Sequence, residues 1–125
     1  MDALEIFKQF VAAINGHDLS AVTALLAAGH VFVDSLGNRV AGAKSMEAGW
    51  RGYFGMCRDY WIRVDNLIEE NSTILAVGEA GGTIDGVSWR TPGAWKAVIV
   101  DGRVAEWRVF ADNKPVYEIL AARKH

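Results

Sequence analysis

The N-terminal half of the chain repeats apolar residues with the spacing of amphipathic helices. Apolar positions recur every three or four residues over residues 4–14, and Asp2 can cap that helix. Asp18 can cap a second, short helix that runs to about Gly29. A third helix is predicted over about residues 43–58, and its apolar stripe consists of Met46, Trp50, Tyr53, Phe54 and Cys57.

The remainder of the pattern is typical of strands. A short strand, residues 30–34, lies between the second and third helices, and from residue 59 the period changes to that of a sheet. Asp85-Gly86 and Asp101-Gly102 are hairpin turn signals. A last short helix follows Asp112-Asn113. The predicted strands of the meander are 60–68, 73–84, 87–100 and 103–111, so the fold class is α+β with helices on one face of a curved, mostly antiparallel sheet.

The two hairpins predict which side chains share a face, because directly paired residues point the same way. Two-residue turns place Lys96 opposite Trp107 and Ala94 opposite Val109, on one face with Glu79. The residues on the other face then include Trp89, Trp95, Ile99, Glu106, Arg108 and Phe110. Both faces are largely apolar, so we expect the helices to cover one and a second subunit, in a homodimer, to cover the other. A β-bulge near residues 91–93 would break this parity.

Asp34 ends the short strand and is the first candidate for chemistry. His30, Phe32 and Asp34 alternate along the strand and share one face. If Phe32 faces the core, Asp34 does too, and an acid directed toward an apolar interior has a raised pKa and can transfer protons near neutral pH. The alternative is that Asp34 caps the following turn and is solvated. His30, at the strand start, is expected to be structural.

The composition bounds the protein further. The 125 residues form one domain, 1–125, and a net charge of −2 favours neither nucleic acid nor an anionic membrane surface. Cys57 is the single cysteine, which excludes a disulfide framework, and its place on the helix stripe predicts a core residue. No apolar run has membrane-spanning length, and we expect a cytoplasmic protein. The sequence predicts no metal and no cofactor.

Two stretches carry a resemblance to a known group of folds. Residues 7–37 read FKQFVAAINGHDLSAVTALLAAGHVFVDSLG, and residues 98–120 read VIVDGRVAEWRVFADNKPVYEIL. With the order of elements, the chain resembles the nuclear-transport-factor-2-like (NTF2-like) superfamily, which includes ketosteroid isomerases, SnoaL-type polyketide cyclases and limonene epoxide hydrolases. The resemblance implies a cone-shaped, cystatin-like α+β barrel in which helices close a pocket at the open end of the sheet.

The family's functional positions carry over unevenly. The base of the ketosteroid isomerases falls on Asp34, but their two hydrogen-bond donors to the oxyanion fall on Phe10 and Ala94, which cannot donate. Limonene epoxide hydrolases need an Asp after the Trp-Arg of the last long strand, where this chain has Val109. The resemblance therefore argues against steroid isomerisation and against epoxide hydrolysis by that route.

The resemblance also places the face of Ala94 toward the pocket. Glu79 can line the pocket or form a cross-strand pair with Arg90, and Lys96 can pair with Trp107 or anchor an acidic ligand. The predicted ligand-binding residues are Phe10, Phe32, Trp50, Tyr53, Glu79, Ala94, Lys96, Trp107 and Val109. Two functions stay open: an isomerase, cyclase, dehydratase or hydrolase that uses Asp34 on a small apolar substrate, or a non-catalytic ligand-binding or dimerisation module.

Overall fold

The structure is a computed structural model that describes residues 2–123. It contains the predicted α+β elements and adds one short strand. In chain order the elements are α1 (Ala3–Asn15), α2 (Leu19–Leu25), β1 (Leu26–Val33), β2 (Arg39–Ala41), α3 (Ala43–Met56), β3 (Trp61–Glu70), β4 (Thr73–Ile84), β5 (Val87–Val100), β6 (Arg103–Ala111) and α4 (Lys114–Ala122). None of the helices that the structure describes is long and apolar enough to span a membrane.

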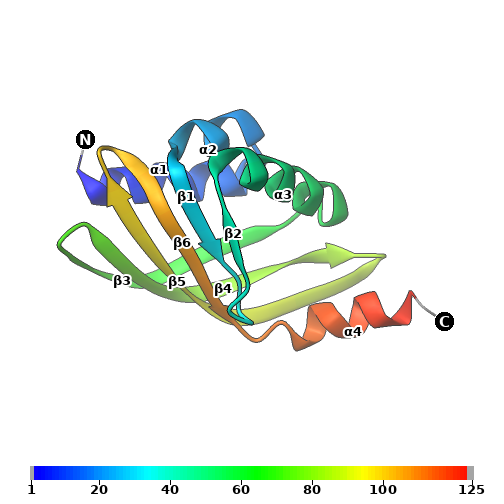
Figure 1. Cartoon of the computed structure of the whole chain (residues 1–125). Helices are drawn as coiled ribbons and strands as arrows, with labels where there is room; N and C mark the ends of the chain where they lie inside the picture. The colour runs from blue at the N-terminus through cyan, green and yellow to red at the C-terminus, as the bar shows by residue number, and fades with distance from the viewer. Residues whose placement is uncertain (1, 124–125) are drawn as a thin grey trace.

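All six strands form one curved sheet in the order β2-β1-β6-β5-β4-β3. The pairing is antiparallel except between β1 and β6, which run parallel. Helices α1, α2 and α3 lie together on one side of the sheet, and α4 extends from the end of β6 past the strands (Figure 1). The predicted α+β class with a curved, mostly antiparallel sheet is confirmed.

The predicted caps of the first two helices are present. The Asp2 carboxylate accepts a hydrogen bond from the Glu5 backbone N–H at 2.9 Å, and the Asp18 carboxylate accepts one from the Ala21 N–H at 3.1 Å. The second helix, however, ends at Leu25 and not near Gly29. The chain becomes a strand earlier because the following residue, Leu26, is buried and already pairs with β6.

The two Asp-Gly hairpins have different registers beyond their turns. Asp85-Gly86 pairs Ile84 with Val87, and the register then continues unbroken along β4 and β5, as predicted. The Asp101-Gly102 hairpin contains a β-bulge at Ala105, because β5 pairs Ile99 with Val104 but Val98 with Glu106. From there on Lys96 lies opposite Arg108 and Ala97 opposite Trp107, so the predicted Lys96–Trp107 and Ala94–Val109 pairs are wrong.

The bulge puts the tryptophans of β5 and β6 on the same, helix-covered face. Trp95 and Trp107 are each 1% exposed, and Phe7 and Phe10 of α1 pack on the Trp107 ring with centroid distances of 5.9 and 4.9 Å. Ile99 is also buried on this side. The prediction that Trp95 and Ile99 lie on the outer face is therefore wrong. The residues that do face outward from these two strands include Lys96, Glu106, Arg108 and Phe110.

Candidate functional site

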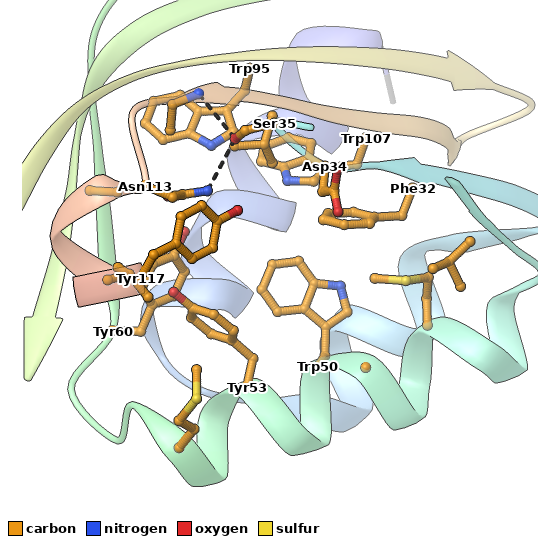
Figure 2. A pocket seen from close by; sticks show the side chains of 18 of the residues that line it. Phe32, Asp34, Ser35, Trp50, Tyr53, Tyr60, Trp95, Trp107, Asn113 and Tyr117 are labelled. Atoms are coloured by element: carbon orange, nitrogen blue, oxygen red, sulfur yellow. Dashed lines mark hydrogen bonds between the residues drawn. The ribbon is translucent and has the colours of Figure 1, made fainter. Parts of the chain in front are cut away.

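A cavity of about 350 Å³ lies between the inner face of the sheet and helices α3 and α4. Its wall is mainly aromatic, and the rings point toward a shared space from several elements (Figure 2). Four of the five tryptophans of the chain contribute to it. The eight aromatic residues that line the cavity are Phe32, Trp50, Tyr53, Tyr60, Trp89, Trp95, Trp107 and Tyr117.

The cavity wall is held by ring-to-ring packing. Tyr53, on α3, meets Tyr60 edge to face with ring centroids 4.8 Å apart, and Tyr60 stacks toward Trp89 at 6.1 Å. Behind the wall, the fully buried Phe10 ring packs edge-on against Trp50 at 6.3 Å and against Trp107 at 4.9 Å. Such aromatic contacts restrain the side chains, so the cavity is largely formed before any ligand enters.

Most of the predicted apolar site residues line this cavity. Phe32, Trp50, Tyr53, Trp107 and Val109 do so, together with Asp34. Phe10 does not, since its ring lies behind Trp50 and Trp107 and is 0% exposed. The prediction that Phe10 forms the wall itself is corrected to a supporting position one layer deeper.

Glu79, Ala94 and Lys96 are not at the cavity. The β4–β5 register places them on the opposite face of the sheet from Trp95, and the bulge moves Trp107 to the Trp95 side. Glu79 Oε2 pairs with Arg90 Nε at 2.8 Å, which is the alternative cross-strand role considered for it, and Glu79 Oε1 pairs with a second arginine. Lys96 Nζ lies 3.0 Å from Glu106 Oε2 and forms no pair with Trp107.

The sequence prediction missed several lining residues. Trp89 and Trp95 were assigned to the wrong face, although burial preference alone would have directed these two tryptophans inward and the charges of the same strand outward. Tyr117 lines the cavity from α4, and no local pattern predicts that this helix lies beside the cavity. Ser35 and Asn113 also line the cavity.

Asp34 lies at the end of β1 and is held in a turn. Its Oδ1 accepts hydrogen bonds from the backbone N–H groups of Leu36 and Asn38, both at 2.9 Å, and its Oδ2 accepts one from Asn38 Nδ2 at 3.0 Å. Partial burial by itself raises the pKa of Asp34, but the hydrogen bonds from Asn38 and Leu36 outweigh it, so the pKa lies below the usual 3.8. Asp34 is thus an ionised carboxylate at neutral pH, and the raised pKa expected from an inward-facing acid is wrong.

Ser35 connects the end of β1 to the start of α4. Its Oγ accepts hydrogen bonds from the Ala111 backbone N–H and from Asn113 Nδ2, both at 3.2 Å (Figure 2). Because the oxygen accepts twice, the hydroxyl hydrogen of Ser35 is left to be donated. These contacts fix the segment between β6 and α4 beside the cavity.

The remaining polar groups in the wall are the phenols and the indole N–H groups, of which those of Trp50 and Trp89 are buried without a hydrogen-bond partner in the described part of the chain. Burial raises the pKa values of Tyr53 and Tyr60, so both stay neutral. Among residues 2–123 no protein group forms a hydrogen bond with either hydroxyl. They can each offer a donor to a bound molecule.

The sequence comparison identifies the family. Residues 7–107 match the family described as the SnoaL-like domain. The chain belongs to the SnoaL-like domain family. A search among curated proteins found no match at the sequence level.

Solved structures share the fold of this SnoaL-like domain. A presumed SnoaL-like polyketide cyclase from Shewanella denitrificans has a TM-score of 0.84 at 13% identity, covering 96% of this chain and 97% of its own. A protein of unknown function with a cystatin-like fold from Xanthomonas campestris has a TM-score of 0.81 at 17% identity, covering 92% of this chain and 94% of its own. A hypothetical protein with a ketosteroid isomerase-like fold from Catenulispora acidiphila was solved in complex with trimethylamine. It has a TM-score of 0.76 at 18% identity, covering 84% of this chain and 83% of its own. At these identities the likeness shows the fold.

Of the other reactive side chains of the SnoaL-like domain, Cys57 and Asp59 lie together, with the thiol donating to an Asp59 carboxylate oxygen at 3.8 Å. Among residues 2–123 no three His, Cys, Asp or Glu side chains come together as metal ligands would. Cys57 is 0% exposed, as predicted for a core residue, and burial raises the pKa of its thiol.

His30 has the structural role expected from its position. It is 0% exposed, and its Nδ1 lies 2.7 Å from the Val104 carbonyl oxygen, to which it must donate. Nε2 has no hydrogen-bond partner in the described part of the chain. Burial lowers the pKa of His30 below 6.5 despite the opposing influence of the Val104 carbonyl and Glu106.

This buried imidazole should make stability depend on pH. The unfolded state binds a proton at His30 near pH 6.5 and the folded state only at lower pH, so the free energy of unfolding should fall as pH drops below 6.5. Because a single proton is involved, the free energy of unfolding should change by at most about 1.4 kcal/mol per pH unit. Urea unfolding between about pH 7 and about pH 5 measures it. A His30→Gln variant should show a shallower slope; equal slopes would contradict the assignment.

Proposed function

We propose that this SnoaL-like domain binds a small, largely apolar organic molecule in the aromatic cavity. The supporting observation is the cavity itself: about 350 Å³ of space with an aromatic wall and a few polar groups at defined positions. Ligand sites for small molecules have this size and character. The volume suits a terpenoid, an aromatic compound or a polyketide fragment. A protein of the same fold has been solved with a small organic molecule, trimethylamine.

Tryptophan emission provides the test, because four tryptophans line the cavity. Borneol, a compact terpenoid alcohol that does not absorb with tryptophan, should produce a saturable change in emission. A Val109→Phe variant places a larger side chain in the wall and should weaken binding by about tenfold or more. An emission change that does not saturate would contradict the proposal. So would equally tight borneol binding by the wild-type protein and by the Val109→Phe variant.

A second candidate is an acid–base enzyme that uses Asp34. The observation that favours it is position: of the described side chains that line the cavity, Asp34 is the one with a charge. The low pKa makes Asp34 a weak base, so its substrate would need an acidified proton, such as one next to a carbonyl. The Tyr53 and Tyr60 hydroxyls could donate hydrogen bonds to that carbonyl oxygen, in place of the donors lost at Phe10 and Ala94.

We also propose that two copies of the chain associate through the outer face of the sheet. With Trp95 and Ile99 buried, the exposed apolar residues of that face include Leu75, Val77 and Phe110, which are 46%, 49% and 49% exposed. Charged pairs surround them, with both signs available for a self-complementary contact. An apolar centre with a charged rim is the usual anatomy of a protein interface.

Light scattering at micromolar concentration should give the mass of two chains. A Phe110→Glu substitution introduces a charge into the centre of the proposed interface and should shift the protein to a monomer, since two like charges would face each other across the two-fold axis or be buried unpaired. Val87→Glu is the control, because Val87 is equally exposed at 50% but lies at the β4–β5 turn. A wild-type monomer would contradict the proposal.

A further inference from the structure

We infer that the cavity selects an organic cation, a substituted ammonium group on an apolar body, over neutral and anionic molecules of the same shape. This inference rests on the proposed small-molecule function and specifies its ligand. Two features carry it: the aromatic wall and the sign of the one charge at that wall.

The wall presents electron-rich rings from several elements. Trp50 and Tyr53 come from α3, Trp95 and Trp107 from the sheet, and Tyr117 from α4 (Figure 2). The faces of such rings carry partial negative charge and attract ammonium groups, most strongly for tryptophan and where water is excluded. Burial keeps Tyr53 in its neutral form, so the wall changes little with pH in the physiological range.

Asp34 adds a full negative charge at the cavity. The hydrogen bonds that it accepts from Leu36 and Asn38 keep the carboxylate ionised and fix its orientation. Oδ2 accepts one hydrogen bond, from Asn38, and so retains a lone pair for a ligand. A cation placed there would meet a carboxylate that needs no rearrangement to receive it.

No compensating positive charge belongs to the described cavity wall. Lys96, the residue expected to anchor an acidic ligand, pairs with Glu106 on the other face of the sheet. An anionic ligand would therefore be repelled by Asp34 and would find no positively charged side chain in the described wall. A neutral ligand would remove water from the Asp34 carboxylate without compensating for the lost hydration, whereas a cation would replace that hydration by an ionic contact.

An isosteric pair of probes separates charge from shape. Benzyltrimethylammonium and neopentylbenzene differ by the exchange of a quaternary nitrogen for a quaternary carbon, and both can be titrated by tryptophan emission. A purely apolar cavity would favour the hydrocarbon. We expect the cation to bind wild-type protein at least about tenfold more tightly. The preference should shrink between about 0.05 M and about 0.5 M NaCl, because salt screens the Asp34 charge.

The Asp34→Asn variant tests the source of the preference. It should weaken cation binding by about fivefold or more and leave hydrocarbon binding unchanged or tighter, because the amide costs less to desolvate than the carboxylate. Asp101→Asn is the matched control, since Asp101 lies in the β5–β6 turn outside the cavity wall and its positive φ of 51° suits asparagine. Circular dichroism confirms folding; if Asp34→Asn does not fold, the wild-type preference and its salt dependence decide alone.

The outcomes distinguish this inference from the function on which it rests. Equal or tighter binding of neopentylbenzene by wild-type protein overturns the cation preference and leaves the apolar ligand site in place. A cation preference unchanged in folded Asp34→Asn overturns the role given to Asp34. Saturable binding of neither probe, nor of borneol, would remove both the inference and the proposed function.

Discussion

Replacing Gly78 with alanine is expected to lower the free energy of unfolding by about 3 kcal/mol or more. Gly78 lies in β4 opposite Val64, where β3 contains a bulge. A Cβ atom at this position would lie 1.7 Å from the Arg63 carbonyl oxygen and 2.8 Å from its carbonyl carbon. Because these neighbours are backbone atoms of a paired strand, they cannot rotate away. The substitution must separate the strands locally or displace the bulge.

Gly52→Ala is the matched control. Gly52 lies in α3, and a Cβ there would have no atom within 4 Å. Alanine is the better helix former, so this variant should be more stable than wild type by about 0.5–1 kcal/mol. Urea unfolding of the three proteins gives both changes. A Gly78→Ala cost below about 1 kcal/mol would contradict the close approach of β3 and β4.

The fold was largely predictable because local signals agree along the chain. Asp2 and Asp18 cap their helices, and each Asp-Gly pair forms a turn with positive φ at both residues. The short strand β2 was not predictable from its pattern. It is a three-residue edge strand with every residue exposed, so its sequence shows no alternation of buried apolar and exposed polar residues.

The site was less predictable because one bulge changes the face of every later residue. Ala105 has no feature that distinguishes it from an ordinary strand residue, yet it moves Trp107 from the side of Lys96 to the side of Trp95. The resemblance to known folds added a second error when it placed Ala94 toward the pocket. The amphipathic pattern of β5 favoured the opposite and correct orientation, with Trp89 buried and Arg90 exposed.

Asp34 shows how one residue can satisfy two alternatives at once. The sequence left open whether it caps a turn or enters the pocket, and it does both: Leu36 and Asn38 donate to it, and it lines the cavity with Phe32. The alternation of side chains along the strand, which puts Asp34 on the same face as Phe32, predicted its position at the cavity. Its pKa could not be predicted from parity, because the hydrogen bonds that lower it come from the turn that follows the strand.

If the SnoaL-like domain is an enzyme, Asp34→Asn should lower turnover by a factor of about one hundred or more. The amide keeps an oxygen that can accept from the backbone N–H groups of Leu36 and Asn38, so the turn should persist, but it cannot take a proton. Binding of a neutral ligand such as borneol should change by less than about twofold, since shape and apolar wall are retained. Turnover and emission titration on the same preparations separate the two effects.

The pH profile gives an independent check on the same residue. Because the pKa of Asp34 lies below 3.8, the carboxylate remains a base throughout the neutral range, and the acid limb of kcat/KM should fall only below about pH 4. Asp101→Asn, in the β5–β6 turn, should leave rate and profile unchanged. A substrate that Asp34→Asn converts at the wild-type rate would exclude Asp34 as the base. The aromatic cavity would then be a binding site whose carboxylate selects the charge of its ligand and takes no part in proton transfer.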